Sequence, residues 1–518
     1  MYYLYIFLLT VCFSLIITSF GCFKSIRRSA TLFAITMFPF IWYRLFCPIY
    51  NGPIFTQLSD NRNPIINDMV RPWGDSFVCK PKQIIYPKTW EDLQQSVRNS
   101  TSVRVVGAGH SFSPLICTTD TLISLTKLKK YKIYQNYIFV EAGFTIEMVQ
   151  NVLSEHNKIV HGFGSIQDQN VAGAFMTSHH GLNFNSFAEE VMQIAVVLSN
   201  GTIQNITGDQ LPVWRSSMGM LGIVVAMQIQ THQNKQVKIT STKLKLEDAI
   251  KQLPTGFAGI IESNYNQKNH GLLKHIVIDQ EKILSQEYPV LTNHFTSALW
   301  DTFVIPLTVI FPFISSFPLL DFATETITVT PILNAWTHHS EYGMMYSAYA
   351  IPYTNCTRFI KAINTDNHFI STILVRYLKG QENTTCLTFA AKDACVVDIY
   401  DLQSQRNMVS YHIKLEQLVH SFGGLSHWGK YYVGDIQQQI QNIPCFDTFN
   451  KTRTKLDPRD KFLNNYTREI IYNISNNRFP GNTIQHYRVK AIAYTVIISF
   501  SVILSFWVLL DLNFNQIS

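Results

Sequence analysis

Long apolar runs at both ends of the chain stand out from a mixed pattern of hydrophobic and polar residues. Residues 491–510 contain no charge and have about the length that crosses the apolar core of a bilayer. Residues 2–23 are equally apolar, lack the basic start of a cleaved signal peptide, and precede a basic cluster at 24–28. We therefore predict a membrane anchor region within residues 1–50 and a transmembrane helix at 489–511.

A further apolar stretch, residues 31–47, contains Pro39 and Arg44, so it spans the membrane, re-enters it or lies in its interface. Basic residues beside the terminal runs favour a cytoplasmic domain between them, which a second span would reverse. We expect an integral membrane protein of an endomembrane, in contact with the lipid bilayer, and leave open which side the domain faces. In a lumenal domain, several N-x-S/T triplets would accept glycans: Asn99, Asn205, Asn355, Asn383 and Asn473.

Between the anchors, strand-like and helix-like segments alternate. Residues 51–72 are polar and contain Asn and Pro, which predicts a linker. The pattern then predicts a strand at 83–86, a helix with acidic residues 91–92 in its first turn, and a helix at 146–155 capped by Thr145. Together these segments indicate an α+β domain. Further strands are predicted at 103–106, 122–125 and 137–143.

A hairpin is predicted where Asn200 and Gly201 separate two β-rich runs, because these are the preferred residues of a type I′ turn. It leads into SSMGMLGIVVAMQIQT, residues 216–231, a glycine-punctuated turn followed by a strand.

Two other glycine-bearing segments can approach a ligand closely. The strand-like run 103–106 is followed by the loop 107–113, GAGHSFS. Successive backbone N–H groups of this loop can bind a diphosphate, and His110 in the same loop would lie beside the bound group. Residues 162–186 alternate small and polar residues, which close backbone approach to a bulky ligand requires. The alternatives are an ordinary strand-to-turn junction for the first segment and a small-residue contact between domains for the second.

Composition narrows the function classes. The 518 residues leave room for two or three domains, and the net charge of +7 includes no dense basic block that would indicate nucleic-acid binding. The nine cysteines are scattered without a CxxC pair, so we expect neither a zinc site nor a disulfide framework. His179 and His180 lack nearby carboxylate or cysteine partners in the sequence, so we expect no metal site.

The glycine-bearing segments resemble those of the FAD-linked oxidases related to vanillyl-alcohol oxidase and p-cresol methylhydroxylase. VVGAGHSFSP, GSIQDQNVAGAFMTSHHG and MGMLGIVV match the three FAD loops in order, and GGLSHWGK at 423–430 resembles GGRPHWGK of the aldonolactone oxidase branch. That branch includes L-gulonolactone, D-arabinonolactone and alditol oxidases. The resemblance covers roughly residues 73–466 and is weakest at 235–385.

The resemblance implies an α+β fold with a two-subdomain FAD-binding domain at 73–234. A substrate-binding domain with an antiparallel sheet and flanking helices would follow at 235–425, and a C-terminal segment at 426–485 would return to the flavin. It also implies that His110 is bonded covalently to the flavin 8α position. Other residues that would contact FAD are Gly107, Ala108, Gly109, Ser111, Phe112, Ser113, Gly164, Ser165, Ile166, Gln169, Gly173, Thr177, His180, Gly181, Gly222, Ile223 and Val224.

The implied reaction is hydride transfer from a hydroxyl-bearing carbon to the flavin. Lys430, His427 and Arg376 are the catalytic candidates, because a base must take the hydroxyl proton and cations must hold the reduced flavin. The resemblance also implies that the residue before Ser-Ile in the second loop, here Gly164, lies near the reactive edge of the flavin, where a side chain could hinder oxygen. We therefore expect an oxidase that makes hydrogen peroxide from a hydroxylated small molecule.

The sequence departs from the branch at its substrate side. Leu374 stands where relatives have the glutamate of a Glu-x-Arg strand, Ala348 where they often have another glutamate, and Leu425 and Ser426 replace Arg-Pro. The apolar stretch 303–322 could line a lipid-facing entrance or form a buried core segment. Two alternatives therefore stay open: a dehydrogenase or reductase acting on a lipid-like substrate, and a non-catalytic membrane protein that contains FAD.

Overall fold

The computed structural model describes most of the chain between the predicted anchors. No helix among these residues is both long and apolar enough to cross a membrane. The predicted segments 1–50, 303–322 and 489–511, together with Ser165 and Asn473, lie outside the described residues. The described residues are 64–66, 68–70, 72, 76–164, 166–181, 183–256, 258–264, 270–278, 326–331, 344–363, 370–402 and 408–472.

The predicted linker does not end as a plain coil. Its last part forms a small antiparallel hairpin in which Ile65 pairs with Val70. Val70 is fully buried and bridges to Cys79, so this hairpin belongs to the folded domain. Its strands are β1 (Ile65–Ile66) and β2 (Met69–Val70).

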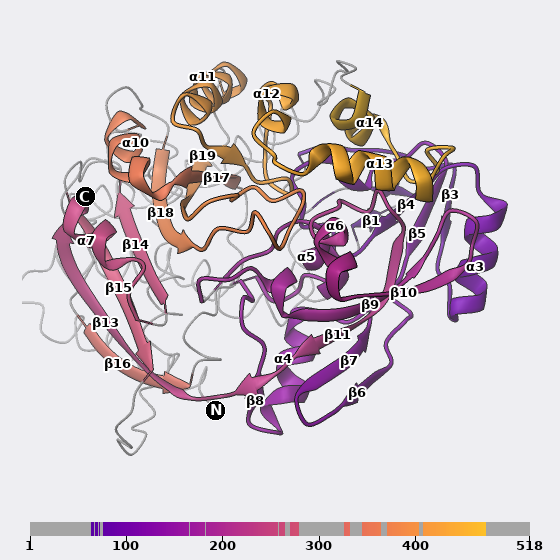
Figure 1. Ribbon diagram of the computed structural model, residues 1–518, viewed down its shortest axis with the longest axis horizontal. Coiled ribbons are helices and arrows are strands. Elements are labelled where there is room, and N and C mark those ends of the chain that lie inside the picture. Colours follow the sequence, from indigo (N-terminus) through magenta and orange to yellow (C-terminus); the bar gives the residue numbers. More distant parts are fainter. Residues whose placement is uncertain are drawn as a thin grey trace, which may run out of the picture. The chain divides into compact units, whose positions relative to one another are not determined.

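The first glycine loop follows the edge strand β4 of a small parallel sheet with strand order β3-β5-β4 (Figure 1). The predicted helix is α3 (Trp90–Asn99), and the Oγ1 atom of its N-cap Thr89 accepts a hydrogen bond from the Asp92 amide. It buries Leu93 and Val97, which holds it on the sheet. The strands are β3 (Gln83–Ile85), β4 (Val103–Val106) and β5 (Thr121–Ser124), and η1 (Pro114–Ile116) follows the loop.

A second, antiparallel sheet has the order β10-β9-β11-β7-β6. The helix predicted at 146–155 is α4 (Ile146–Ser154), and Thr145 caps it as expected. The sheet comprises β6 (Tyr131–Ile133), β7 (Tyr137–Glu141), β9 (Val191–Val197), β10 (Ile203–Thr207) and β11 (Ile223–Gln230), flanked by α5 (Val171–Met176), η2 (Phe187–Glu190), η3 (Gly208–Gln210) and α6 (Leu211–Trp214).

The hairpin at Gly201 is confirmed, but its predicted turn type is wrong. Val197 pairs with Ile203, and the Leu198 amide donates to the Thr202 carbonyl, so the tip is longer than two residues. Gly201 has φ +80°, whereas Asn200 is not among the described residues with positive φ. A type I′ turn needs positive φ at both positions, so only the glycine adopts the left-handed conformation here.

An eight-stranded antiparallel sheet, in the order β16-β13-β15-β14-β18-β19-β17-β20, follows among the described residues. Helices α10 (Cys356–Ile363) and α11 (Met408–Ser421) pack against one face, which carries Tyr349, Val375 and Val397 (Figure 1). Side chains alternate along strands, so Ala348, Leu374 and Asp398 occupy the other face. The strands are β13 (Gln236–Lys245), β14 (Ala258–Asn264), β15 (His270–Ile278), β16 (Thr326–Pro331), β17 (Met344–Pro352), β18 (Ile370–Leu378), β19 (Ala394–Leu402) and β20 (Leu425–Ser426).

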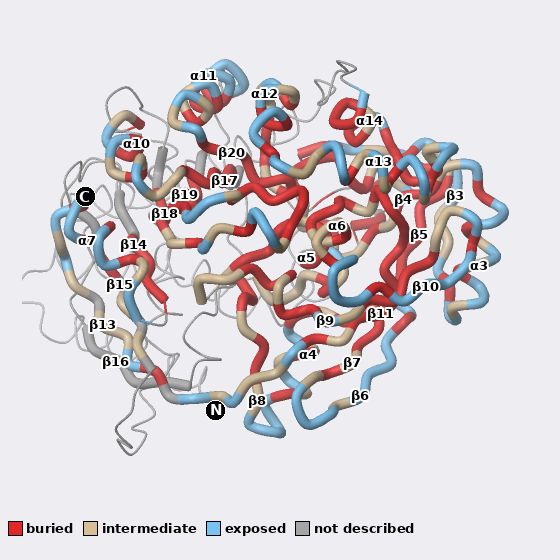
Figure 2. The backbone as a smooth tube through the Cα atoms, viewed as in Figure 1, coloured by how far each residue is buried: buried red, intermediate tan, exposed pale blue. Residues whose placement is uncertain are grey.

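That second face packs toward the part of the chain that carries the glycine segments. Ala350, Val396 and Leu378 share a hydrophobic cluster with Phe175 and Met176 of α5. In Figure 2 the buried positions run through β4, β5 and β11 and continue into this region. The remaining elements are β8 (Lys158–Ile159), β12 (His232–Gln233), α7 (Leu246–Gln252), η8 (Tyr353–Asn355), α10 (Cys356–Ile363), α11 (Met408–Ser421), α12 (Ile436–Ile440), α13 (Phe446–Leu456) and α14 (Asn465–Tyr472).

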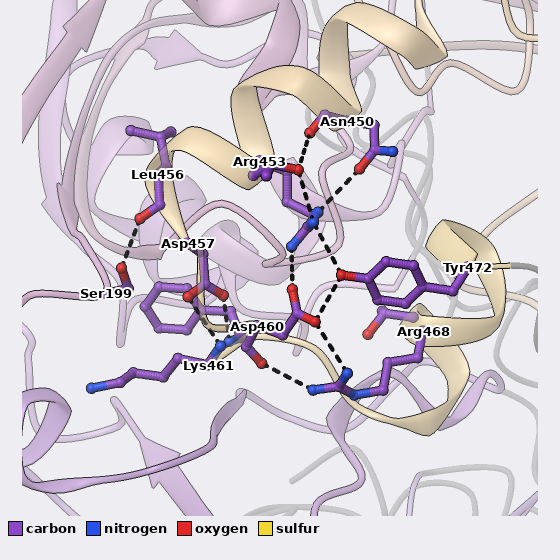
Figure 3. A network of polar contacts seen from close by, with 12 residues as sticks. Ser199, Asn450, Arg453, Leu456, Asp457, Asp460, Lys461, Arg468 and Tyr472 are labelled. Atoms are coloured by element: carbon purple, nitrogen blue, oxygen red, sulfur yellow. Dashed lines mark hydrogen bonds and ion pairs between the residues drawn. The ribbon is translucent and has the colours of Figure 1, made fainter.

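The turn between α13 and α14 is fixed by a polar network (Figure 3). Asp460 accepts hydrogen bonds from Arg453 at 2.6 Å, Arg468 at 3.1 Å and Tyr472 at 2.8 Å. Asp457 accepts from the backbone amides of residues 461 and 462. The network holds the closing segment in one conformation.

This closing segment returns to the first sheet. The Val103 amide donates to the Lys461 carbonyl at 2.8 Å, and Phe462 is buried beside Leu93. The Asn464 side-chain amide donates to the carbonyls of Pro114, Leu115 and Cys117. The C-terminal segment therefore supports the end of the first glycine loop.

The expectation of no disulfide framework is wrong. Among the described residues, cysteines pair as Cys79–Cys117, Cys356–Cys395 and Cys386–Cys445, with Cα atoms 5.7, 5.9 and 5.1 Å apart. The partners are 38 to 59 residues apart in the chain. Tertiary folding brings them together, so local cysteine spacing carried no signal of the pairing.

Candidate active site

The first glycine loop lies directly against the HWGK segment, more than 300 residues away in the chain. The Phe112 amide donates to the Gly429 carbonyl at 2.8 Å. The Ser113 hydroxyl contacts the carbonyls of Trp428 and Lys430, each at 2.7 Å. The Lys430 ammonium lies 5.8 Å from the Phe112 ring centroid. Two segments that the sequence predicted to share a site are therefore in contact.

The second glycine segment meets the same HWGK segment through one carbonyl group. Ser178, at φ +57°, presents its carbonyl to His180 Nδ1 at 3.0 Å and to His427 Nε2 at 3.3 Å. Its hydroxyl bonds that of Ser216, in the third glycine segment, at 2.6 Å. The Gly429 amide donates to His427 Nδ1 at 3.0 Å. Both nitrogens of His427 thus bind backbone groups, and this imidazole ties the HWGK segment to the second loop.

Arg376 extends from β18 into this cluster. Its Nη2 atom lies 3.0 Å from His180 Nε2 and 2.5 Å from the Asp398 carboxylate. Both members of the ion pair are largely buried, with side chains 11% and 9% exposed. The backbone register places Asp398 opposite Leu374 on one neighbouring strand and opposite Ala348 on the other.

Asp398 is a site residue that the sequence interpretation missed. The residues expected to be acidic in relatives, at 374 and 348, flank it in one row across the sheet. Directly paired residues of antiparallel strands project to the same face, so the carboxylate stands between the two apolar positions. The available signal was a single acid inside the apolar run ACVVDIY.

Burial sets the charges of this cluster. Burial is the main reason that the pKa of His180 lies well below its usual range, and the nearby charge of Arg376 lowers it further. Burial likewise lowers the pKa of His427 well below the usual range, with an added effect from His180. Burial lowers the pKa of His179 to about 3, and its Nε2 accepts a hydrogen bond from the Gly164 amide at 2.6 Å. These imidazoles are therefore neutral at pH 7.

Lys430 and Arg376 supply the positive charges of the cluster. Burial and Arg376 lower the pKa of Lys430, whereas Asp398 raises it. With Lys430 protonated, Arg376 and Lys430 together exceed the charge of Asp398 by one positive charge. Such a cluster suits a ligand that acquires one negative charge during a reaction.

His110 has a carboxylate neighbour that the sequence interpretation also missed. Its Nε2 lies 3.0 Å from Asp168 Oδ1, and its side chain is 7% exposed. A carboxylate at Nε2 favours the tautomer with the proton on that nitrogen, which leaves the lone pair on Nδ1. This arrangement suits a histidine that forms a bond through Nδ1.

The glycines around His110 are required by close packing. Gly109 has φ +71°, and a Cβ there would meet Pro64 at 2.6 Å. A Cβ at Gly107 would meet Asn170 Oδ1 at 2.7 Å. The first loop is thereby fixed between the segment that carries the β1–β2 hairpin and the start of α5.

The expected role of Gly164 as an open path for oxygen has a competing structural reason. A Cβ at this position would meet His179 Cε1 at 2.8 Å and the His180 carbonyl at 3.0 Å. The glycine is therefore needed for packing against the second loop itself.

The other predicted FAD contacts divide into two groups. Gly173 is exposed, a Cβ there would meet no described atom within 4 Å, and the Thr177 hydroxyl bonds its carbonyl at 2.9 Å. The half-buried residues Ala108, Ser111, Ile166, Gln169 and Gly181 belong to the same two loops. By contrast, Gly222, Ile223 and Val224 are buried and form the junction into β11, packed on β9.

Arg104 joins three of the segments that surround the first loop. Its guanidinium donates to the carbonyls of Leu115, Phe462 and Met218 at 2.6 to 2.9 Å. Burial lowers its pKa to about 10, so it stays charged at neutral pH. A charged residue inside the apolar strand VRVV was the signal for such a buried connector.

Comparison with protein families and curated proteins agrees with this geometry. Residues 81–207 match a family model described as FAD binding domain, and residues 262–470 match one described as D-arabinono-1,4-lactone oxidase. The chain is 21% identical over 429 residues to L-gulono-1,4-lactone dehydrogenase of Mycobacterium tuberculosis, covering 77% of this chain and 98% of the relative. It is 20% identical over 446 residues to L-gulonolactone oxidase of Mus musculus, covering 77% and 97%.

Solved structures share the fold. Cholesterol oxidase from B. sterolicum superposes with a TM-score of 0.62 at 12% identity, covering 80% of this chain and 99% of that one. A solvent-stable cholesterol oxidase gives 0.62 at 13% identity, covering 78% and 97%. The expected α+β FAD-binding oxidase fold is thereby confirmed. The chain therefore carries a segment similar to FAD-binding domains followed by one similar to D-arabinono-1,4-lactone oxidases, which agrees with the predicted resemblance to the FAD-linked oxidases of the p-cresol methylhydroxylase type.

Proposed function

We propose that this protein is an FAD-dependent oxidase that takes a hydride from a hydroxyl-bearing carbon of an aldonolactone- or alditol-like molecule and passes the electrons to oxygen, giving hydrogen peroxide. We further propose that His110 holds FAD covalently and that the protein resides in an endomembrane through its terminal apolar runs. The observation that carries the enzymatic proposal is the convergence of both glycine loops with Arg376, Lys430 and Asp398.

The residues present fit FAD. Gly107 and Gly109 fix the first loop against Asn170 and Pro64, whereas a Cβ at Gly173 would meet no described atom within 4 Å, so the second loop has open space beside it for a ligand. The single net positive charge of the Arg376, Lys430 and Asp398 cluster matches a flavin that becomes anionic on reduction. Lys430 and the loop 107–113 would hold the isoalloxazine side of the cofactor. When bound, FAD supplies the hydride acceptor.

We assign the substrate hydroxyl to Asp398 and Arg376. An ionised carboxylate only accepts hydrogen bonds and a guanidinium only donates them, so the pair can orient a hydroxyl group and receive its proton at a carboxylate oxygen. His180 Nε2 accepts a hydrogen bond from Arg376 and keeps the guanidinium in place. His427 acts as a neutral brace, because both of its ring nitrogens bind backbone.

The electron acceptor is tested by reoxidation. Purified protein is photoreduced without air and then mixed with oxygenated buffer in a stopped-flow spectrophotometer. An oxidase recovers the oxidised flavin spectrum within seconds and forms one hydrogen peroxide per flavin. Recovery over many minutes, with rapid turnover of an artificial dye, would instead support a dehydrogenase.

A further inference from the structure

A cluster outside the candidate active site has the composition of a metal centre. We propose that His161, Glu190 and His232 bind a divalent transition-metal ion such as Zn²⁺. One ligand atom from each side chain lies within 4.8 Å of the others. His232 Nε2 lies 2.7 Å from Glu190 Oε2, and the imidazole rings of His161 and His232 stack with centroids 3.8 Å apart.

The donor set suits a borderline ion rather than Mg²⁺ or Ca²⁺, which prefer oxygen ligands throughout. Two imidazoles and one carboxylate provide three ligands and leave a position for water. The ion would take the place of the proton in the hydrogen bond between His232 Nε2 and the Glu190 carboxylate. The two imidazole planes are now nearly parallel, 5° apart, so at least one ring has to rotate to point its lone pair at the ion; the ligand atoms already lie within 4.8 Å of one another.

Burial and charge also favour ligation. Glu190 is 6% exposed, whereas His161 and His232 are half-buried, so an ion can reach the cluster from solvent. Lys235 is the nearby cation along the chain, and it is exposed, so solvent screens its charge from an ion bound at the cluster.

The place of the cluster in the fold indicates what the ion would do. His161 directly precedes the second glycine segment, and Glu190 ends η2, which follows that segment. Gly162 packs against the Phe187 backbone, so the two ends of the segment already meet. His232 lies in β12, shortly before the chain enters the eight-stranded sheet.

An ion bound here would therefore clamp the base of the second FAD loop to the connection between the two domains. The expectation of no metal site rested on neighbours of His179 and His180 in the sequence. The three residues of this cluster are well separated in the chain, with Glu190 and His232 42 positions apart, so sequence spacing did not reveal them.

The test uses tag-free, full-length holoprotein in detergent, stripped with a chelator and titrated with Zn²⁺ or Co²⁺. We expect one equivalent to bind with a Kd below about 10 μM, visible Co²⁺ absorption bands, and a rise in Tm. Mg²⁺ should produce none of these. His161→Ala and His232→Ala should each weaken binding by about 100-fold or more while retaining bound flavin. The exposed His156→Ala variant should bind like the wild type.

Failure is visible in the wild type alone. If stripped wild-type protein binds neither ion at tens of micromolar and shows no rise in Tm, the proposal is wrong, and the cluster is an ion pair with a stacked imidazole. Binding that persists unchanged in a folded His161→Ala, His232→Ala double variant would also overturn it. Neither result depends on turnover, so both are independent of the proposed oxidase function.

Discussion

Asp398→Asn lowers kcat by about 100-fold or more while the protein retains its full FAD content, the range expected when a proton-accepting group is removed. The asparagine keeps the shape of the side chain but cannot take a proton. It also leaves Arg376 and Lys430 without their anionic partner in the cluster. The measurement is steady-state turnover with the best substrate, alongside flavin absorbance per protein.

The matched control is Asp393→Asn, just before β19. Asp393 accepts hydrogen bonds from Tyr377 and the Gly380 amide, away from the cluster. The Asp393→Asn substitution should change kcat less than about threefold, within the usual effect of a surface substitution. An Asp398→Asn variant with wild-type kcat and KM would contradict the role assigned to Asp398.

A double variant separates the catalytic role from a structural one. Leu374 lies directly opposite Asp398, and paired Cβ atoms in antiparallel strands are about 5 Å apart. Leu374→Glu combined with Asp398→Asn returns a carboxylate to the same face. We expect the kcat of this double variant to be at least about tenfold higher than that of Asp398→Asn alone, because part of the general-base contribution is restored. If the double variant folds normally but its kcat stays as low as that of Asp398→Asn, the position of the carboxylate, and not its charge alone, is essential.

We expect His110→Ala to abolish the proposed covalent attachment of FAD. After acid denaturation, the wild-type pellet remains yellow, whereas the variant releases its flavin into the supernatant. His156→Ala, an exposed histidine, keeps the wild-type result. Free FAD in the supernatant of denatured wild-type protein would refute the bond.

Asp168 provides a finer test of the same attachment. Its carboxylate lies 3.0 Å from His110 Nε2 and favours the tautomer that leaves Nδ1 nucleophilic. Asp168→Asn should therefore bind FAD but contain a smaller covalent fraction. Asp168→Glu should restore part of that fraction. An unchanged covalent fraction in Asp168→Asn would show that another group orients the imidazole.

Much of the FAD-binding part could be predicted because its signals are local. The helix with acidic residues 91–92 in its first turn, the helix capped by Thr145 and the glycine loop at 107–113 are set by neighbouring residues, and the structure confirms these elements. The resemblance also placed Arg376 and Lys430 in one site, and both lie in the cluster.

What could not be predicted depends on contacts between distant segments. Asp398 gains its place only when β18, β19 and β17 align, because the register places it between Leu374 and Ala348. The cysteine pairs and the cluster around Glu190 likewise form only on folding. At residues 200–201 the Asn-Gly rule predicted the hairpin correctly but gave the wrong turn type. The hairpin tip is longer than a two-residue type I′ turn and has positive φ at Gly201 but not at Asn200.

Anaerobic mixing with candidate substrates tests the central claim most directly. Full-length holoprotein is mixed without oxygen with L-gulonolactone, D-arabinonolactone, alditols or sterols while the flavin absorbance is recorded. We predict that an aldonolactone or alditol bleaches the oxidised flavin band in one turnover and that Asp398→Asn bleaches about 100-fold more slowly. Bleaching by a sterol alone would contradict the proposed substrate class, and an unchanged spectrum with every compound would contradict the proposed enzymatic role.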